Sequence, residues 1–379
     1  MGSRVDSLIV FREADPASGG LGIDIADVAQ GLSARGHRVE VMAMRSPDGS
    51  AGDLGPDVVM HGLEPWLRTR AGVAFGLAGG TRRVVRARTP RVLHVYSCLP
   101  VHMHWTAALA AHRARVPVVW TPMLHPARTA LWRNHGLAGR AMTLWDACAP
   151  RAARWADAVC AATRAEAQLF AGMGARRVAL VPPAVHPAAR VSASEAQALR
   201  ERLGLRDAPL VLCVAGRPDR RKGLDYAAAV VTALRDRVPN AVLGTVGLGD
   251  NVPLARVDGV RALGRLSLRD LRRAYRAADV VFVPSRYEAF SRVVVEGWQQ
   301  ARPVVVSDRV ALAEEVQHGG GAVVPFGDVE AGAAALEHYL RDRDEAQRAG
   351  EYGAELVSER YLVGSALDRL ERVYAEVAR

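Results

Sequence analysis

Residues 280–297 read Val280-Val-Phe-Val-Pro-Ser-Arg-Tyr-Glu-Ala-Phe-Ser-Arg-Val-Val-Val-Glu-Gly297. The first four apolar residues predict a buried strand, Pro284 ends it, and the apolar run after Ser291 predicts a helix. A strand, a turn and a helix form the repeating unit of parallel α/β sheets. Glu288 falls in the turn and Glu296 in the helix, so the stretch also places two carboxylates near one strand end.

Outward from this stretch, strand-like and helical runs alternate along the chain. In the first half we expect strands over residues 7–11, 38–44, 92–96, 118–121, 158–161 and 178–181, and helices over 22–35 and 137–155. A second series of strands is expected over residues 210–215, 241–246, 260–263, 280–283, 304–307 and 322–324. Alternation of this kind predicts parallel sheets covered by helices, and each half is a complete doubly wound unit.

The boundary between the two halves is the stretch Pro182-Pro-Ala-Val-His-Pro-Ala-Ala-Arg190. Its prolines end a strand and exclude a helix. We therefore predict one domain over residues 1–186, joined by a final helix over 363–379, and a second domain over 187–362. Ligands of open α/β sheets bind at the carboxyl ends of the strands, so we expect two facing domains with a ligand in the cleft between them.

Composition excludes several classes of protein. The chain has 379 residues, is 50% hydrophobic and carries a formal net charge of +10. It contains no apolar run of about 18 residues and no signal-peptide pattern, so we expect a cytoplasmic protein whose cysteines are reduced. Arginines alternate with acidic residues, as in Arg341-Asp-Arg-Asp344, rather than forming a basic stripe. We therefore expect no nucleic-acid partner, and a weak contact with an anionic membrane stays open.

The chain has fifty Lys and Arg residues, and its single lysine is Lys222, within Gly216-Arg-Pro-Asp-Arg-Arg-Lys-Gly223. This stretch follows a predicted strand and precedes a predicted helix, a position where backbone amides favour anions. Lysine is a compact point charge that suits a narrow approach to a phosphate. Arg217 and Lys222 are candidates to hold a diphosphate and stabilise it as a leaving group, and the alternative is a solvated basic turn.

The two carboxylates of the opening stretch suit sugar binding. A carboxylate accepts hydrogen bonds through two oxygens, as neighbouring sugar hydroxyls require. The N–H groups of Phe290, Ser291 and Arg292 are expected to be unsatisfied at the helix start and ready for a phosphate. The alternative takes Glu288 as a turn residue and Glu296 as an ordinary helical charge.

The first half offers weaker candidates. Gly19-Gly-Leu-Gly22 lies between the first strand and the first helix, but lacks the full GxGxxG spacing of dinucleotide-binding loops. It is either a loop that faces a phosphate or a tight turn. His125 follows the strand expected over residues 118–121, where it is either structural or part of the ligand edge.

Taken in order, these motifs resemble those of a retaining glycosyltransferase of family 4, which has the GT-B fold of two Rossmann-like domains. The likeness covers nearly the whole chain. It rests on Gly19–Gly22, Arg35-Gly-His-Arg-Val-Glu-Val41, Gly216-Arg217 with Lys222-Gly223, Gly264-Arg-Leu266, Val280–Ser285 and the Glu288-x7-Glu296 pair.

The resemblance implies a role for each matching position. Arg217 and Lys222, beside Gly216, would contact the donor diphosphate, and Glu296 would bind the ribose. It further implies that Glu288, Ala289 and the amides of Phe290–Arg292 contact the donor sugar. Arg265 and Leu266 would contact the base, and Gly19 and Gly20 the phosphates. His125 would lie near the reaction centre, catalytic with Arg217, Lys222 and Glu288. Ala289 and Ser291 stand where the family usually has glycine, which allows for an unusual donor.

The activity implied is transfer of a sugar from a UDP- or GDP-linked donor to the hydroxyl of a small-molecule acceptor bound by the first domain, with His125 and Trp132 as acceptor contacts. We expect front-side attack, with no metal ion or other cofactor, in the biosynthesis of a secondary metabolite such as an antibiotic. The alternatives are a lipid or polysaccharide acceptor, or a nucleotide-sugar epimerase or hydrolase of the same fold. A monomer and a homodimer are equally compatible with the sequence.

Overall fold

The structure is a computed structural model, and it describes residues 5–11, 20–45, 54–64, 67–68, 74–75, 77–96, 102–123, 149–216, 220–248 and 253–379. The chain divides into two compact units. Unit 1 comprises Met1–Ala184 and Val363–Arg379, and unit 2 is the continuous stretch Val185–Leu362. The chain passes from unit 1 to unit 2 two residues before the boundary expected from the proline-rich stretch. It returns to unit 1 at the residue where the final helix was expected to begin.

The sheet of unit 1 is parallel, with the strand order β3-β2-β1-β6-β7-β8-β9. Its strands are β1 Asp6–Val10, β2 Arg38–Met44, β3 Val59–Leu63, β6 Val92–Tyr96, β7 Val118–Thr121, β8 Ala158–Ala161 and β9 Val178–Leu180. A short antiparallel pair, β4 Leu67–Arg68 and β5 Ala74–Phe75, stands apart from it. The edge strand β3 was not predicted.

Helices cover both faces of this sheet. Successive strand residues point to opposite sides, and because both sides are apolar, each side packs against helices. Ile9 packs into a cluster with α1 (Gly20–Ala34) and α14 (Val363–Val377), whereas Leu8 and Val10 pack toward α2, α3 and α6. The helices of the second face are α2 Leu77–Arg88, α3 His102–Arg113 and α6 Arg164–Gly172. Helix α1 begins at Gly20, two residues earlier than predicted, so Gly20–Gly22 belong to its first turn rather than to a preceding loop.

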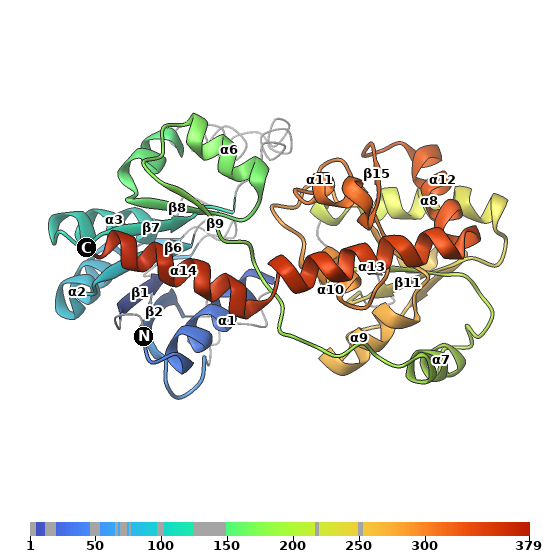
Figure 1. The fold of residues 1–379 in the computed structure, drawn as a ribbon, viewed down its shortest axis with the longest axis horizontal. Helices are drawn as coiled ribbons and strands as arrows, with labels where there is room; N and C mark the ends of the chain where they lie inside the picture. Colours follow the sequence, from blue (N-terminus) through green and yellow to red (C-terminus); the bar gives the residue numbers. More distant parts are fainter. Residues whose placement is uncertain are drawn as a thin grey trace. The chain divides into compact units, whose positions relative to one another are not determined.

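The last helix of the chain, α14, completes unit 1, where Figure 1 shows it beside α1. Arg35, after α1, donates to Asp368 at 2.7 Å and to Glu371 at 2.9 Å. Inside the unit, His94 bonds to the Tyr374 hydroxyl through Nδ1 and to Thr121 Oγ1 through Nε2, both at 2.7 Å. Burial lowers the pKa of His94 to about 3, so its ring is neutral.

The sheet of unit 2 is also parallel, with the order β12-β11-β10-β13-β14-β15. Its strands are β10 Leu210–Val214, β11 Val242–Val246, β12 Val260–Ala262, β13 Val280–Val283, β14 Val304–Ser307 and β15 Gly321–Val324. Its helices are α7 Ala193–Arg202, η2 Arg220–Lys222, α8 Leu224–Arg237, η3 Pro253–Arg256, α9 Leu268–Ala277, α10 Arg292–Gln299, α11 Ala313–Glu315, η4 Val316–Gly320, α12 Val329–Arg341 and α13 Arg343–Arg360.

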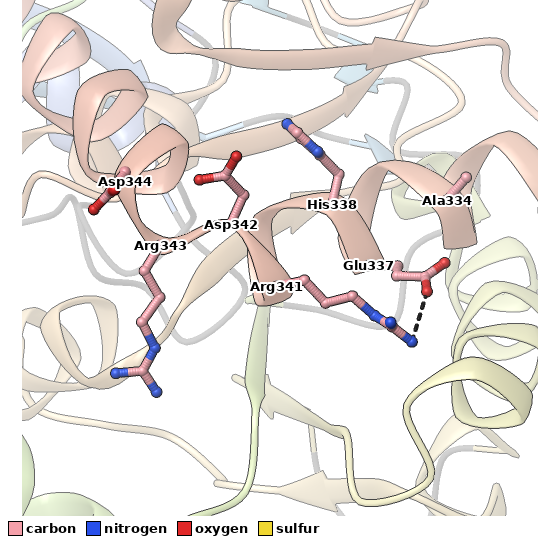
Figure 2. Close-up of a pocket in the computed structure, with 7 residues that line it drawn as sticks. All are labelled: Ala334, Glu337, His338, Arg341, Asp342, Arg343 and Asp344. Atoms are coloured by element: carbon pink, nitrogen blue, oxygen red, sulfur yellow. Dashed lines mark ion pairs between the residues drawn. The ribbon is translucent and has the colours of Figure 1, made fainter.

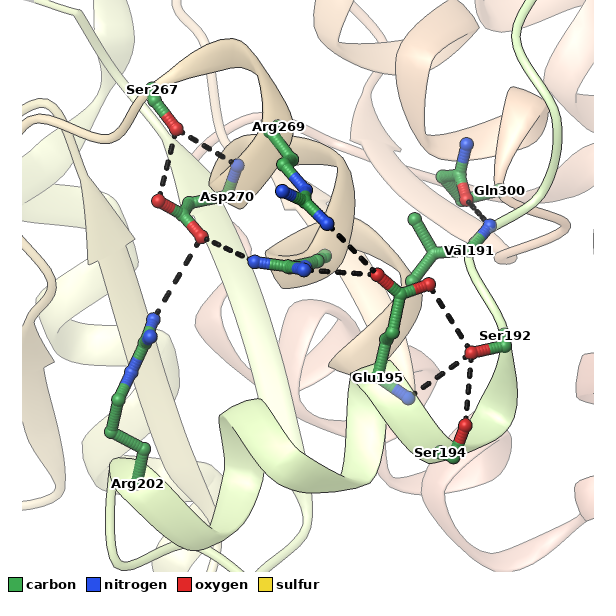
Figure 3. Close-up of polar contacts among 10 residues, drawn as sticks. Val191, Ser192, Ser194, Glu195, Arg202, Ser267, Arg269, Asp270 and Gln300 are labelled. Atoms are coloured by element: carbon green, nitrogen blue, oxygen red, sulfur yellow. Dashed lines mark hydrogen bonds and ion pairs between the residues drawn. The ribbon is translucent and has the colours of Figure 1, made fainter.

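Helices α7 and α9 are joined by a polar network (Figure 3). Ser192 caps α7 by accepting from the Glu195 amide at 3.2 Å, and Ser267 caps α9 by accepting from the Asp270 amide at 3.1 Å. Arg273 then donates to Asp270 at 3.2 Å and to Glu195 at 2.9 Å. The helix that follows the domain boundary is thereby fastened to unit 2.

Helix α10, which carries Glu296, is fixed from behind by a buried ring. Trp298 is fully buried and donates through Nε1 to the Gly320 carbonyl at 2.8 Å. A Cβ at Gly353 of α13 would lie 2.1 Å from this ring, so the glycine allows α13 to pack directly on α10. Any side chain at position 353 would push the two helices apart.

Two further predictions concern the cysteines, which are expected to be reduced, and the absence of an apolar run long enough to span a membrane. Cys160 and Cys213 are buried free thiols, and burial raises the pKa of each to about 12. Cys98 and Cys148 lie outside the described residues. Among the described residues, no helix combines the length and hydropathy needed to cross a bilayer.

Candidate functional site

The candidate site lies in unit 2, at the carboxyl edge of its sheet. Lys222 closes η2 in the loop after β10, and Glu288 lies in the loop between β13 and α10. Since β10 and β13 are neighbours in the sheet, their following loops meet at the same edge. Glu296 lies in α10, eight residues after Glu288.

The two loops meet through an ion pair. Lys222 Nζ lies 2.6 Å from Glu288 Oε1, and the side chains are 27% and 19% exposed. Ser285 Oγ donates to the same carboxylate oxygen at 3.1 Å. The pair is therefore partly shielded from water but still open on one side. The structure thus brings together the lysine and the first glutamate that the sequence singled out separately.

The backbone makes this close approach possible at Gly223. This residue has φ +62° and ψ +34°, in the left-handed region that favours glycine. A Cβ at this position would lie 1.9 Å from the carbonyl oxygen of Pro284. The Arg286 amide also donates to the Arg221 carbonyl at 2.7 Å, and the Arg286 side chain pairs with Asp225. The lysine loop therefore lies directly against the loop that carries Glu288.

The main chain of Glu288 is held from its other side by the segment after β14. Its amide donates to the Arg309 carbonyl at 3.2 Å, and its carbonyl accepts from the Ala311 amide at 3.0 Å. Ser307, at the end of β14, donates through Oγ to the Ser285 carbonyl at 2.5 Å. Three neighbouring strand ends thus fix the position of one carboxylate.

Glu296 is held by side chains on either side of it. The Tyr275 hydroxyl of α9 donates to Oε2 at 2.8 Å, and Arg292 Nε lies 3.5 Å from Oε1, one turn earlier in α10. Burial raises the pKa of the Glu296 carboxyl, while the nearby Arg292 charge lowers it. A quarter of its side-chain surface remains exposed, so its oxygens can accept further hydrogen bonds.

The start of α10 combines free amides with a strained residue. The N–H groups of Phe290 and Ser291 find no acceptor within the described part of the chain. Ser291 has φ +97°, which is unusual for any residue other than glycine. Its hydroxyl is buried without a partner among the described residues and does not cap the helix. The substitution of the usual glycine by serine therefore strains this turn, and Ala289 beside it is partly exposed.

The next loops along this edge of the sheet are those after β11 and β12. Gly247 donates to the Gly264 carbonyl at 2.7 Å, and a Cβ on Gly247 would lie 2.8 Å from the Gly216 Cα. Gly216, Gly264 and the following Arg265 and Leu266 therefore continue the edge on the far side of Lys222. Arg265 is exposed and Leu266 half-buried.

Several site residues predicted from the sequence are not among those that the structure places at the carboxyl edge of unit 2. Gly20 is exposed as the first residue of α1 in unit 1. Gly19, His125, Trp132 and Arg217 lie outside the described residues, and their assigned roles stay predictions. Within the described ranges, no three His, Cys, Asp or Glu side chains are grouped so that they could hold a metal ion.

The sequence analysis gave no role in the site to four contributors, although Gly223 and Ser285 lie within its motifs. Ser285 lies just after β13, and Gly223 directly precedes α8 in the loop that follows β10, so the rule that ligands bind at the carboxyl edge could have singled them out. Tyr275 and Arg309 approach from other elements, and no local sequence signal identifies them.

Comparison with known protein families now adds to this geometry. The family described as "Glycosyl transferase 4-like domain" matches residues 19–184, and the family described as "Glycosyl transferases group 1" matches residues 208–342. The two matches together span nearly all of unit 1 before α14 and most of unit 2.

Individual relatives agree with these matches. D-inositol 3-phosphate glycosyltransferase of Xylanimonas cellulosilytica is 30% identical over 96% of this chain and 93% of its own. Alpha-D-kanosaminyltransferase of Streptomyces kanamyceticus is 32% identical, over 47% of this chain and 48% of its own.

Solved structures share the fold. HepE of Anabaena, solved with UDP-glucose, is similar with a TM-score of 0.75 at 18% identity, covering 98% of this chain and 100% of that one. Sucrose-phosphate synthase of Thermosynechococcus elongatus gives a TM-score of 0.74 at 22% identity, covering 98% and 99%. These likenesses show the GT-B fold that the sequence predicted. The chain therefore belongs to the group 1 glycosyl transferases of family 4, and it is a glycosyltransferase that uses nucleotide sugars.

Proposed function

We propose that this enzyme transfers a sugar from a nucleotide-diphosphate donor to a hydroxyl group of a small polar acceptor, with retention of anomeric configuration and without a metal ion. The observation that carries the proposal is the Lys222–Glu288 ion pair at the carboxyl edge of the second sheet. It places a cation for a diphosphate beside a carboxylate for a sugar, next to a helix start with free amides.

Each charged side chain has a part in donor binding. Lys222 has three donor hydrogens, so it can bind a phosphate oxygen while it stays near Glu288. Arg217, five residues earlier, would add a second cation. Glu288 would accept from sugar hydroxyls and Glu296 from the ribose. The free N–H groups of Phe290 and Ser291 would bind sugar or phosphate oxygens.

The chemical step would be a front-side displacement. The acceptor oxygen bonds to the anomeric carbon as the bond to the diphosphate breaks, and a diphosphate oxygen takes the acceptor proton. Glu288 is engaged with Lys222 and Ser285, so it is a poor nucleophile for a double displacement. The enzyme would then act by orienting the substrates and by stabilising the leaving charge with Lys222 and Arg217.

The acceptor is proposed to be a small polyhydroxylated molecule. The relative matched over nearly its whole length is named for D-inositol 3-phosphate, a small phosphorylated polyol. The partial match is named for the group that it transfers, so its name does not bear on the acceptor. His125 and Trp132 stay the candidates for contacting the acceptor. A role in secondary metabolism, such as antibiotic biosynthesis, has the partial match as its support.

The donor site is tested by binding. Thermal shift against UDP, GDP, ADP and dTDP identifies the nucleotide that the wild-type chain prefers. Lys222→Met and Glu296→Gln should each lose the shift while remaining folded, because each removes one charged contact to the donor. Arg348→Gln is the matched control, since it removes an exposed charge that pairs with Glu345 on α13. A normal shift in either site variant contradicts its role.

The course of the reaction needs separate measurements. NMR of the product should show the anomeric configuration of the donor, and turnover should survive EDTA. An inverted product would refute the front-side mechanism, and loss of turnover with EDTA would refute metal independence. Conversion of the nucleotide sugar at full rate without any acceptor would instead favour an epimerase or hydrolase.

A further inference from the structure

Unit 2 contains an open groove of about 780 Å³ at the opposite edge of its sheet from Lys222 and Glu288. Its lining includes Pro209 and Asp279, which immediately precede β10 and β13, and Arg302, which lies two residues before β14. The groove thus lies at the amino ends of the strands. Its volume falls within the range of small-molecule sites, about 300–1,000 Å³.

The charged residues that line the groove are mostly basic. Among the described residues, five arginines and three carboxylates line it: Arg200, Arg206, Arg276, Arg302, Arg343, Asp207, Asp279 and Glu351. Two of the carboxylates are already engaged. Asp279 accepts from the Leu210 amide at 2.7 Å and pairs with Arg200 at 3.3 Å. Glu351 accepts from Arg190, outside the lining, at 2.7 Å.

Three of the arginines make no close ion pair with any described residue. Arg276, Arg302 and Arg343 form no ion pair within the part of the chain that the structure describes. Burial, together with the nearby charges of Arg276 and Arg200 and against the effect of Asp279, lowers the pKa of Arg302 to about 10. The groove therefore carries more positive than negative charge, although Asp279 offsets part of the Arg302 charge and Glu351 part of the Arg276 charge.

Helix capping explains part of this arrangement. Arg302 donates through Nε and Nη2 to the Arg276 carbonyl at the end of α9, at 3.1 and 2.6 Å. Arg276 donates through Nη1 to the Gln300 carbonyl at the end of α10, at 3.2 Å. A guanidinium has five N–H donors, and these bonds use only some of them. The Nε of Arg276 is buried with no partner among the described residues, and carbonyl oxygens do not neutralise a cation.

Arg343 brings the third guanidinium from another element. It is the first residue of α13 and is exposed. Figure 2 shows its side chain extending away from the carboxylates of Asp342 and Asp344, its neighbours in sequence. Helix capping does not explain its position in the groove.

We propose that this groove binds a phosphorylated small molecule through the guanidinium groups of Arg276, Arg302 and Arg343. The planar fork of arginine donates two parallel hydrogen bonds to phosphate oxygens, which makes a phosphate the anion that this set fits best. The inference does not depend on the donor site, because the two sites lie at opposite edges of the sheet.

Inorganic pyrophosphate is the probe, and titration calorimetry on the full chain is the measurement. The titration uses the Lys222→Met chain, so that the donor site does not contribute a second signal. We expect binding to persist in this chain. Adding Arg343→Gln should weaken it about tenfold, as loss of one hydrogen bond to a charged group predicts. Arg348→Gln, which removes another exposed charge from the same helix but outside the groove, should leave it within about twofold.

Two outcomes overturn the proposal. One is absence of pyrophosphate binding in the Lys222→Met chain. The other is equal weakening by Arg343→Gln and Arg348→Gln, which would mean only a diffuse attraction to a basic surface. Arg276→Gln provides a second variant inside the groove and should also weaken binding. If that variant fails to fold because it loses the cap on α10, the comparison at Arg343 and Arg348 decides.

Discussion

Replacing Gly223 by alanine is expected to separate the two loops that form the donor site. The new Cβ would lie 1.9 Å from the Pro284 carbonyl oxygen, whereas real Cβ contacts below 3.0 Å essentially never occur. Because Pro284 begins the loop that carries Glu288, relief of this clash must move Lys222 and Glu288 apart. Their 2.6 Å ion pair would then be broken or lengthened.

The matched control is Gly204→Ala. Gly204 has φ +65° against +62° for Gly223, but among the described residues a Cβ there would come no closer than 3.6 Å to any atom. Both variants force alanine into the left-handed region, which costs about 1–2 kcal/mol. Gly223→Ala adds overpacking of about 1–3 kcal/mol. A displacement of about 1 Å in an active site can also cost about a hundredfold in rate.

Urea unfolding and donor turnover measure the two effects. We expect Gly204→Ala to lose about 1–2 kcal/mol of unfolding free energy and to keep its turnover. Gly223→Ala should lose about 2–5 kcal/mol and about two orders of magnitude in kcat/KM. If the two variants are equally stable and equally active, the close contact at Gly223 does not hold the site together, and the reasoning is refuted.

Two further predictions concern single side chains. Ser291→Gly should raise the unfolding free energy by about 1–2 kcal/mol, because it removes a buried unpaired hydroxyl and the strain of φ +97°; a lower urea midpoint would contradict this. His94 stays neutral in the folded chain down to about pH 3, whereas the unfolded chain protonates it below about 6.5. Its contribution is therefore present above pH 6.5 and lost as the pH falls. From pH 7 to pH 5 the wild type should lose about 2 kcal/mol more than His94→Leu, and equal losses would exclude His94 as the cause.

The strands were predictable where the sequence is continuously apolar. The bounds expected for residues 38–44 and 280–283 are those of β2 and β13, because buried parallel strands are apolar on both faces. β3 was missed because Val59-Met-His-Gly-Leu63 is a partly exposed edge strand with no alternating pattern. The start of α1 was placed two residues late because glycine is a poor guide to a helix amino end.

The site was predictable only as far as chain order determines it. Lys222 and Glu288 follow neighbouring strands, and parallel topology brings such positions to one edge. Their direct ion pair depends on the backbone conformation of Gly223, which one sequence does not reveal. The contact of Tyr275 with Glu296 depends on how α9 packs on α10, and nothing local to either residue indicates it.

Helix α14 has a consequence for the order in which the protein is made. The ribosome synthesises all of Val185–Leu362 before Val363–Val377, yet Leu367, Leu370 and Tyr374 belong to the core of the first unit. One apolar face of the first sheet therefore lacks its covering helix α14 until the whole of the second unit has been synthesised. The lobe that is translated first should be the last to mature, and it is the one that a chaperone would have to shield.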